Sequence, residues 1–147
     1  SKREVEKGKM KPVRIILHHS LTQDSGTVSW GAIRNYHIYN NGWSDIGYHF
    51  GVENLRGQTE ILIGRLPDRQ GAHCRGNNSD SIGVCFVGNF DKKPPAEETW
   101  SAAIKLVKYL MKTYHIQTIQ GHRDLDPRKT CPGRLFDLEK FKQELGV

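Results

Sequence analysis

The feature that most constrains the fold is a short apolar run near the start of the chain. Val13 to Leu17 (VRIIL) leads directly into His18, His19 and Ser20. An uninterrupted run of aliphatic, largely β-branched residues of this length is typical of a buried strand. The run therefore predicts a strand inside a sheet, with polar side chains delivered at its tip, where many enzymes place their reacting groups.

Strand-like and helix-like segments alternate along the rest of the chain. Further strands are predicted at 48–53, 59–63, 81–87 and 118–120, and helices from Ser29 to about 41, from Pro95 to Tyr114 and over 137–145. The polar turn NLRGQ joins the strands at 48–53 and 59–63 as a hairpin, and residues 65–80 form an irregular loop rich in Gly, Asn and Asp. Interleaved strands and helices predict an α/β fold, with a central mixed sheet flanked by about three α-helices.

The length of 147 residues suits one domain,. We expect residues 1–12 to be a solvated basic tail and residues 13–147 to be the folded domain. A net charge of +6 favours polyanionic partners, which could be nucleic acid, an acidic membrane surface or an anionic cell wall,. No apolar run approaches the roughly 20 residues that span a bilayer, and the first residues lack the apolar region of a signal peptide. We therefore expect no membrane insertion.

Three residues of the kinds that bind zinc could meet at one point. His18 ends the first strand, while His122 and Cys131 flank a loop that Pro and Gly restrict (GHRDLDPRKTCPG). Catalytic zinc is typically held by about three such side chains, with water in the remaining position. The chain's three cysteines cannot all pair with one another, which favours a metal role in a reducing compartment,. His-x8-Cys is not a standard zinc interval, so spacing alone leaves both a metal site and unrelated side chains open,.

Five motifs make the assignment more specific, because they occur together in the order of one family. They are IILHHSLT at 15–22, GWSDIGYHF at 42–50, GAHCRGNN at 71–78, SIGVCFV at 81–87, and GH at 121–122 with KTCPG at 129–133. Over residues 13–138 the chain resembles the zinc-dependent N-acetylmuramoyl-L-alanine amidases, which include phage endolysins and peptidoglycan recognition proteins. The resemblance implies the fold of the type 2 amidases and the peptidoglycan recognition proteins. It also implies hydrolysis of the amide between N-acetylmuramic acid and L-alanine in peptidoglycan.

The same resemblance implies roles for five side chains. His18, His122 and Cys131 match the positions that hold one Zn²⁺ per chain, where the ion activates water as the nucleophile. Tyr48 matches the active-site tyrosine, whose phenol contacts that water and helps to pass its proton. Lys129 matches the basic residue that stabilises the oxyanion formed at the amide carbonyl. Without the resemblance, Tyr48 would be interpreted as a core aromatic and Lys129 as a surface lysine.

A second set of residues lies in the Gly-rich loop that lines the peptide groove in the resembling family. The predicted contacts to the stem peptide are His73, Arg75, Asn77 and Asn78,.

The other histidines are given no catalytic role. Successive strand side chains point to opposite faces, so normally only one of His18 and His19 can reach a metal, and the resemblance selects His18. His49, beside Tyr48, is interpreted as a structural histidine. His37 and His115 are placed within a helix and just beyond one.

Cys85 stands where the recycling amidases of the bacterial cytosol carry a glutamate. This difference resembles a phage endolysin more closely, with Cys85 itself a small buried residue. We therefore expect a lytic enzyme, made in the bacterial cytoplasm, that reaches the wall after another protein has permeabilised the membrane. A monomer is expected, with peptidoglycan as substrate and partner.

Three alternatives from other classes stay open. A peptidoglycan-binding module without catalysis would lack a ligand, usually the cysteine, whereas Cys131 is present. An amidase with an added polymerase-regulating role, through contact with RNA polymerase, is compatible with the basic tail. A nucleic-acid-binding protein is disfavoured because the chain has no recognition helix or stacking motif, and we expect no nucleic-acid partner.

Overall fold

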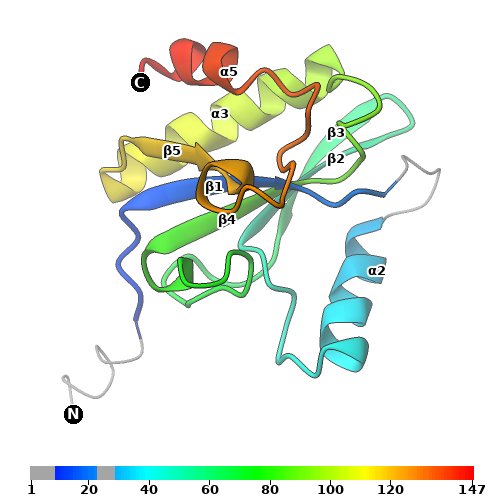
Figure 1. Cartoon of the computed structure of the whole chain (residues 1–147), viewed down its shortest axis with the longest axis vertical. Helices are drawn as coiled ribbons and strands as arrows, with labels where there is room; N and C mark the ends of the chain where they lie inside the picture. Colours follow the sequence, from blue (N-terminus) through cyan, green and yellow to red (C-terminus); the bar gives the residue numbers. More distant parts are fainter. Residues whose placement is uncertain (1–8, 23–28) are drawn as a thin grey trace.

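A mixed five-stranded sheet forms the centre of the molecule (Figure 1), as the sequence predicts. The computed structural model describes residues 9–22 and 29–147. Its strands are β1 (Arg14–His19), β2 (Phe50–Leu55), β3 (Gln58–Ile63), β4 (Ser81–Phe86) and β5 (Thr118–Gly121). Its helices are α2 (Ser29–Asn35), the π-helix η1 (Tyr36–Asn40), the 3-10 helix η2 (Asn78–Asp80), α3 (Glu97–Tyr114), α4 (His122–Leu125) and α5 (Leu138–Leu145).

The strand order is β3-β2-β4-β1-β5, so β1 lies in the interior of the sheet. β1 runs parallel to β4 and β5, and β2 runs parallel to β4. Only the β2–β3 pair is antiparallel, joined by the predicted hairpin turn at Arg56-Gly57, where both residues have positive φ. Because β1 and β5 are parallel neighbours, their carboxyl ends lie at the same edge of the sheet.

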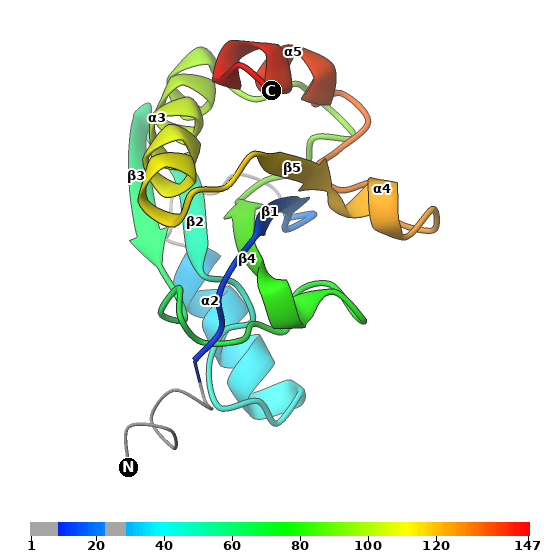
Figure 2. The same cartoon turned by 90° about the vertical axis from the view of Figure 1, so that its left-hand side faces the viewer.

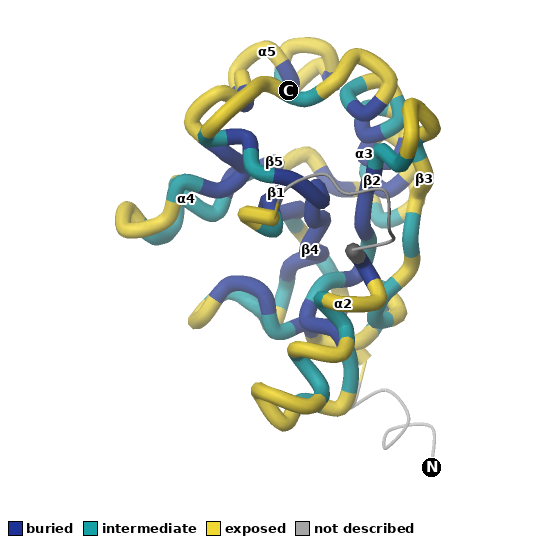
Figure 3. Tube along the Cα trace, turned by 90° about the vertical axis from the view of Figure 1, so that its right-hand side faces the viewer, coloured by how far each residue is buried: buried dark blue, intermediate teal, exposed yellow. Residues whose placement is uncertain are grey.

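Helices cover both faces of the sheet (Figure 2). On one face, α3 and α5 pack over alternate strand residues such as Ile15, Leu17, Val84 and Phe86, which form the main core. On the other face, the ring of Trp30 in α2 contacts β2 at Gly51, where a Cβ atom would lie only 2.6 Å from the ring. Figure 3 shows burial concentrated in β1, β2 and β4, while β3 at the edge of the sheet is largely exposed.

Several boundaries differ from those that the sequence predicts. The predicted strand at 48–53 begins at Phe50, so Tyr48 lies in the segment before β2. The first helix changes to a π-helix at Tyr36, and the loop after Gly121 begins with the short helix α4. These short elements depend on local backbone hydrogen bonds, such as the one that the Asn41 N–H donates to the Tyr36 carbonyl.

The predicted basic tail falls largely outside the described residues, which begin at residue 9. Within its last part, Met10 is buried in the main core, and its N–H donates to the Asp68 carbonyl at 2.6 Å. The packed part of the chain therefore starts before Val13. In the described residues, no helix has the length and apolarity needed to cross a bilayer.

Candidate metal centre

The structure brings His18, His122 and Cys131 together at the carboxyl edge of the parallel strands. One potential ligand atom from each residue lies within 4.8 Å of the other two. The rings of His18 and His122 have their centroids 4.7 Å apart. His18 and Cys131 are buried and His122 is half-buried, so the group is open to solvent on the His122 side. Two imidazoles and a thiol in this arrangement match the donor set of a catalytic zinc site.

Strand geometry explains why residues so distant in sequence converge. His18 lies near the end of β1, and His122 follows directly after β5, the parallel neighbour of β1. The Cys131 segment returns to the same place because the Arg123 N–H donates to the Cys131 carbonyl at 3.0 Å. Close packing of Pro132 against Gly121 fixes the approach, since a Cβ atom at Gly121 would lie 2.8 Å from the proline ring.

The two imidazoles of this group are neutral near pH 7. Burial lowers the pKa of His18 well below its usual value, and neighbouring His73 and His122 add to the effect. Burial also lowers the pKa of His122, helped by the positive charge of Lys129. Burial raises the pKa of the Cys131 thiol. Both histidines therefore present free lone pairs, whereas Cys131 must lose a proton to bind a cation.

Tyr48 and Lys129 flank the group. The ring centroid of Tyr48 lies 5.2 Å from that of His18, and burial raises the pKa of the phenol well above its usual value. The Tyr48 hydroxyl forms a hydrogen bond with the thiol of Cys85, which is fully buried and pairs with His18 across β1 and β4. Lys129 is exposed, and its charge lowers the pKa values of His122 and Cys131. The Tyr48 ring therefore contacts His18, and Lys129 is near enough to His122 and Cys131 to act on them electrostatically.

Three of the residues predicted to contact the stem peptide form hydrogen bonds within the protein. His73 is buried, and its Nδ1 lies 2.8 Å from Nε2 of His18. Asn78 Oδ1 accepts the N–H groups of His73 and Cys74, both at 2.9 Å.

Asn77 is likewise engaged within the protein, because its Oδ1 accepts from Arg14 at 2.8 Å. These bonds engage Oδ1 of both asparagines. Contact of His73, Asn77 and Asn78 with a stem peptide stays a prediction. Arg75 is exposed. The contact between His18 and His73 was not predicted, because 55 positions separate the two residues and no spacing rule connects them.

The remaining histidines near the site have structural partners. His49 is fully buried, with Nδ1 accepting the Gly83 N–H and Nε2–H donating to the Arg69 carbonyl. His19 points away from His18, with Nδ1 accepting the Phe90 N–H at 3.1 Å. Nδ1 of His37 accepts the Gly47 N–H at 2.9 Å. Each of these rings thus fixes backbone around the site.

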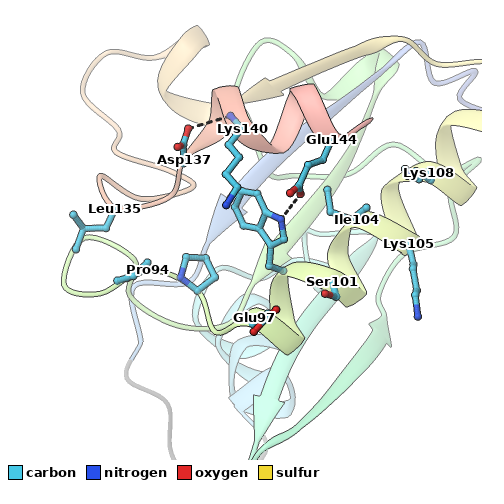
Figure 4. Close-up of a pocket in the computed structure, with 12 residues that line it drawn as sticks. Pro94, Glu97, Ser101, Ile104, Lys105, Lys108, Leu135, Asp137, Lys140 and Glu144 are labelled. Carbon is cyan, nitrogen blue, oxygen red and sulfur yellow. Dashed lines mark hydrogen bonds between the residues drawn. The ribbon is translucent and has the colours of Figure 1, made fainter. Parts of the chain in front are cut away.

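A hollow of about 690 Å³ lies elsewhere, between α3 and α5 (Figure 4). Trp100 forms part of its wall, donating its indole N–H to Glu144 and lying 5.7 Å from Nζ of Lys140. None of the twelve residues drawn there is a histidine or cysteine. The His18, His122 and Cys131 group therefore lies outside this hollow.

The fold and the site together have the features of a metal-dependent hydrolase: a mixed α/β sheet with a His-His-Cys group at its edge that could hold a metal ion,. Residues 8–134 match the N-acetylmuramoyl-L-alanine amidase family. The chain belongs to this family, which confirms the predicted fold and the predicted amidase activity.

Sequence relatives and solved structures agree with this assignment. The chain is 35% identical over 133 residues to an endolysin of Enterobacteria phage K11, covering 87% of this chain and 83% of the relative. It is also 35% identical over 138 residues to an endolysin of Escherichia phage T7, covering 89% and 87%. The structure of the N-acetylmuramoyl-L-alanine amidase LysC from Clostridium intestinale URNW superposes with a TM-score of 0.83 at 30% identity, over 94% of this chain and 87% of the other. Drosophila peptidoglycan recognition protein SD shares the fold, with a TM-score of 0.79 at 24% identity.

Proposed function

We propose that the chain is a zinc-dependent lytic amidase, with one Zn²⁺ held by His18, His122 and Cys131. The single observation that carries the proposal is the convergence of these three potential ligand atoms within 4.8 Å. When bound in such a site, zinc acts as a Lewis acid and lowers the pKa of bound water to about 7. The neutral imidazoles and the open His122 side suit a site that admits both water and substrate.

Tyr48 and Lys129 supply the remaining groups in this proposal. Burial keeps the Tyr48 phenol protonated, so it donates a hydrogen bond to a reacting oxygen beside His18,. The Lys129 ammonium stabilises the negative charge that develops on the amide carbonyl oxygen, an effect worth about 10²–10³ in rate for one such donor. When the amide C–N bond breaks, the L-alanine nitrogen would leave as an amine after taking up the proton that the attacking water gives up.

Arg75 is the residue that we propose for contact with the peptide stem. Its exposed guanidinium can form charge-assisted hydrogen bonds with a stem carboxylate,. Arg75→Ala should raise KM more than it lowers kcat, because the contact lies away from the reacting amide. The reverse pattern would remove Arg75 from the binding site.

The biological role proposed is lysis of a bacterial host by a phage or prophage enzyme acting as a monomer. Support comes from the endolysins of phages K11 and T7, which match the chain over most of their lengths. Such an enzyme, made in the cytoplasm, reaches peptidoglycan once another protein has opened the membrane. The intact Cys131 favours catalysis over mere binding of peptidoglycan.

Purified peptidoglycan provides the direct test. Newly exposed L-alanine amino groups should appear with the wild-type protein, disappear after chelation and return when zinc is added. Cys131→Ser should release none even with zinc. Lys129→Met should bind zinc like wild type but cleave about 10²–10³ times more slowly. If the protein binds peptidoglycan but does not cleave it in the presence of zinc, its function is recognition of peptidoglycan and not hydrolysis.

A further inference from the structure

A buried chain of hydrogen bonds continues behind the proposed zinc ligand His18. His18 Nε2 lies 2.8 Å from Nδ1 of His73, and the two side chains are only 1% and 8% exposed. On the far side of the ring, His73 Nε2 lies 3.3 Å from the hydroxyl of Ser81. That hydroxyl lies 2.5 Å from the carbonyl oxygen of Asn77. The four groups thus form a continuous path from the ligand into the protein.

The direction of every hydrogen bond in this path follows from its last member. A carbonyl oxygen only accepts, so the single hydroxyl proton of Ser81 is donated to Asn77,. The Ser81 oxygen must then accept from Nε2–H of His73, which leaves Nδ1 of a neutral His73 unprotonated,. That Nδ1 accepts from Nε2–H of His18. A neutral His18 therefore carries its proton on Nε2 and keeps a free lone pair on Nδ1.

The protein reserves the space that His73 occupies. A Cβ atom added at Gly83 would lie 2.5 Å from Cγ of His73, and one added at Gly71 would lie 2.7 Å from Cδ2. The backbone N–H of His73 is fixed by Asn78 at 2.9 Å. Burial lowers the pKa of His73 to about 3, which keeps the ring neutral and able to accept. The ring is therefore held in one place and in one protonation state.

We infer that His73 is a positioning residue for the metal centre: by accepting Nε2–H of His18, it holds His18 in the tautomer whose Nδ1 can bind the metal. The inference rests on the proposed zinc function. Metal-ligating histidines usually donate their second N–H to a carboxylate, a carbonyl or water, and losing that partner costs about 10–100-fold in metal affinity. Here a second histidine takes the place of that partner, with Ser81 behind it.

Removal of the acceptor leaves His18 with two unfavourable choices. Its Nε2–H can stay buried without a partner, or the proton can move to Nδ1 and remove the lone pair that the proposed zinc would need. His73→Phe keeps the ring volume and removes the acceptor, so it should weaken zinc binding about 10–100-fold. His73→Asn keeps an acceptor, Oδ1, near the position of Nδ1 and should bind zinc almost as tightly as wild type. Zinc dissociation constants from competition with a chromophoric chelator measure both effects.

A matched control separates positioning from packing. The His49 ring lies 5.7 Å from that of His73 and is equally enclosed, but its nitrogens bond to backbone and not to His18. His49→Phe should therefore lower the free energy of unfolding while leaving zinc affinity near the wild-type value. If His49→Phe and His73→Phe weaken zinc binding equally, His73 acts only through packing.

Nitrogen-15 NMR of the metal-free wild-type protein tests the hydrogen bond without any variant. Long-range proton–nitrogen correlations should show His18 protonated on Nε2 and His73 protonated on its own Nε2. A His18 proton on Nδ1, or unchanged zinc affinity in a folded His73→Phe, would overturn the inference. Should His73→Phe fail to fold, the wild-type tautomers and the zinc affinity of His73→Asn decide. A wild-type protein that binds no zinc would refute the proposed function instead, since the NMR measurement needs no metal.

Discussion

Gly83→Ala should destabilise the protein, because the new methyl group would overlap sterically with the ring of His73. At Gly83, an added Cβ would lie 2.5, 2.7 and 2.8 Å from Cγ, Cδ2 and Nδ1 of that ring. The ring cannot easily give way, since His18 and Ser81 bond its two nitrogens. Overpacking of a closed site costs about 1–3 kcal/mol. For a domain of this size the melting temperature should then fall by about 3–9 °C.

Gly31→Ala is the matched control for this substitution. Gly31 is exposed in α2, and an added Cβ meets no atom within 4 Å. The same chemical change there should stabilise the helix by up to about 1 kcal/mol. Urea unfolding of the metal-free wild type and both variants gives the comparison. A Gly83→Ala protein as stable as wild type would refute the close packing of His73 on β4.

Two further predictions concern protons. Burial lowers the pKa of His73 in the folded protein to about 3, from its ordinary value of 6.5. As the pH falls, the unfolded chain therefore takes up the proton first, and the free energy of unfolding decreases between about pH 6.5 and pH 3. Between pH 7.5 and 5.5, His73 alone should lower the free energy of unfolding by about 1.4 kcal/mol, measured by urea unfolding with chelator present. If His73→Asn shows the same pH dependence as wild type, this loss of stability does not come from His73. Because burial raises the pKa of Cys131 and lowers that of His18, zinc binding near neutral pH should release about one proton, and affinity should rise about tenfold per pH unit,. Calorimetry in buffers of different ionisation enthalpy counts the released protons, and a pH-independent affinity would show that Cys131 does not bind as thiolate.

Much of the fold could be predicted because strong local patterns coincide with long elements. The apolar run before His18 and the helical stripe ending at Tyr114 occur where expected, as β1 and α3. The short elements could not be predicted, since α4 and the π-helix after Asn35 depend on backbone contacts rather than on periodicity. The strand order could not be predicted from the sequence either, because the pairing of β1 with β5 joins residues about a hundred positions apart.

The candidate site shows the same division. Residue types and motif order were enough to select His18, His122 and Cys131, which the structure brings together. The loop motif selected His73 but did not predict that its side chain is buried beside His18, because a polar residue in a Gly-rich loop is usually exposed,. The burial of His73, its contact with His18 and the space left by Gly83 show that the His73 side chain points into the protein.

The position of β1 has a consequence for synthesis of the protein on the ribosome. Of the five strands that the structure describes, β1 is made first and β5 last, yet β1 lies between β4 and β5. The apolar residues of β1 therefore cannot pair with β4 and β5 until those strands have been synthesised. Such pairing between distant segments is typical of slow-folding topologies. The proposed zinc site also includes Cys131, which follows β5 in the chain. A growing chain that has not reached Cys131 would lack one of the three proposed ligands, so the proposed amidase activity would begin only after that residue has been added.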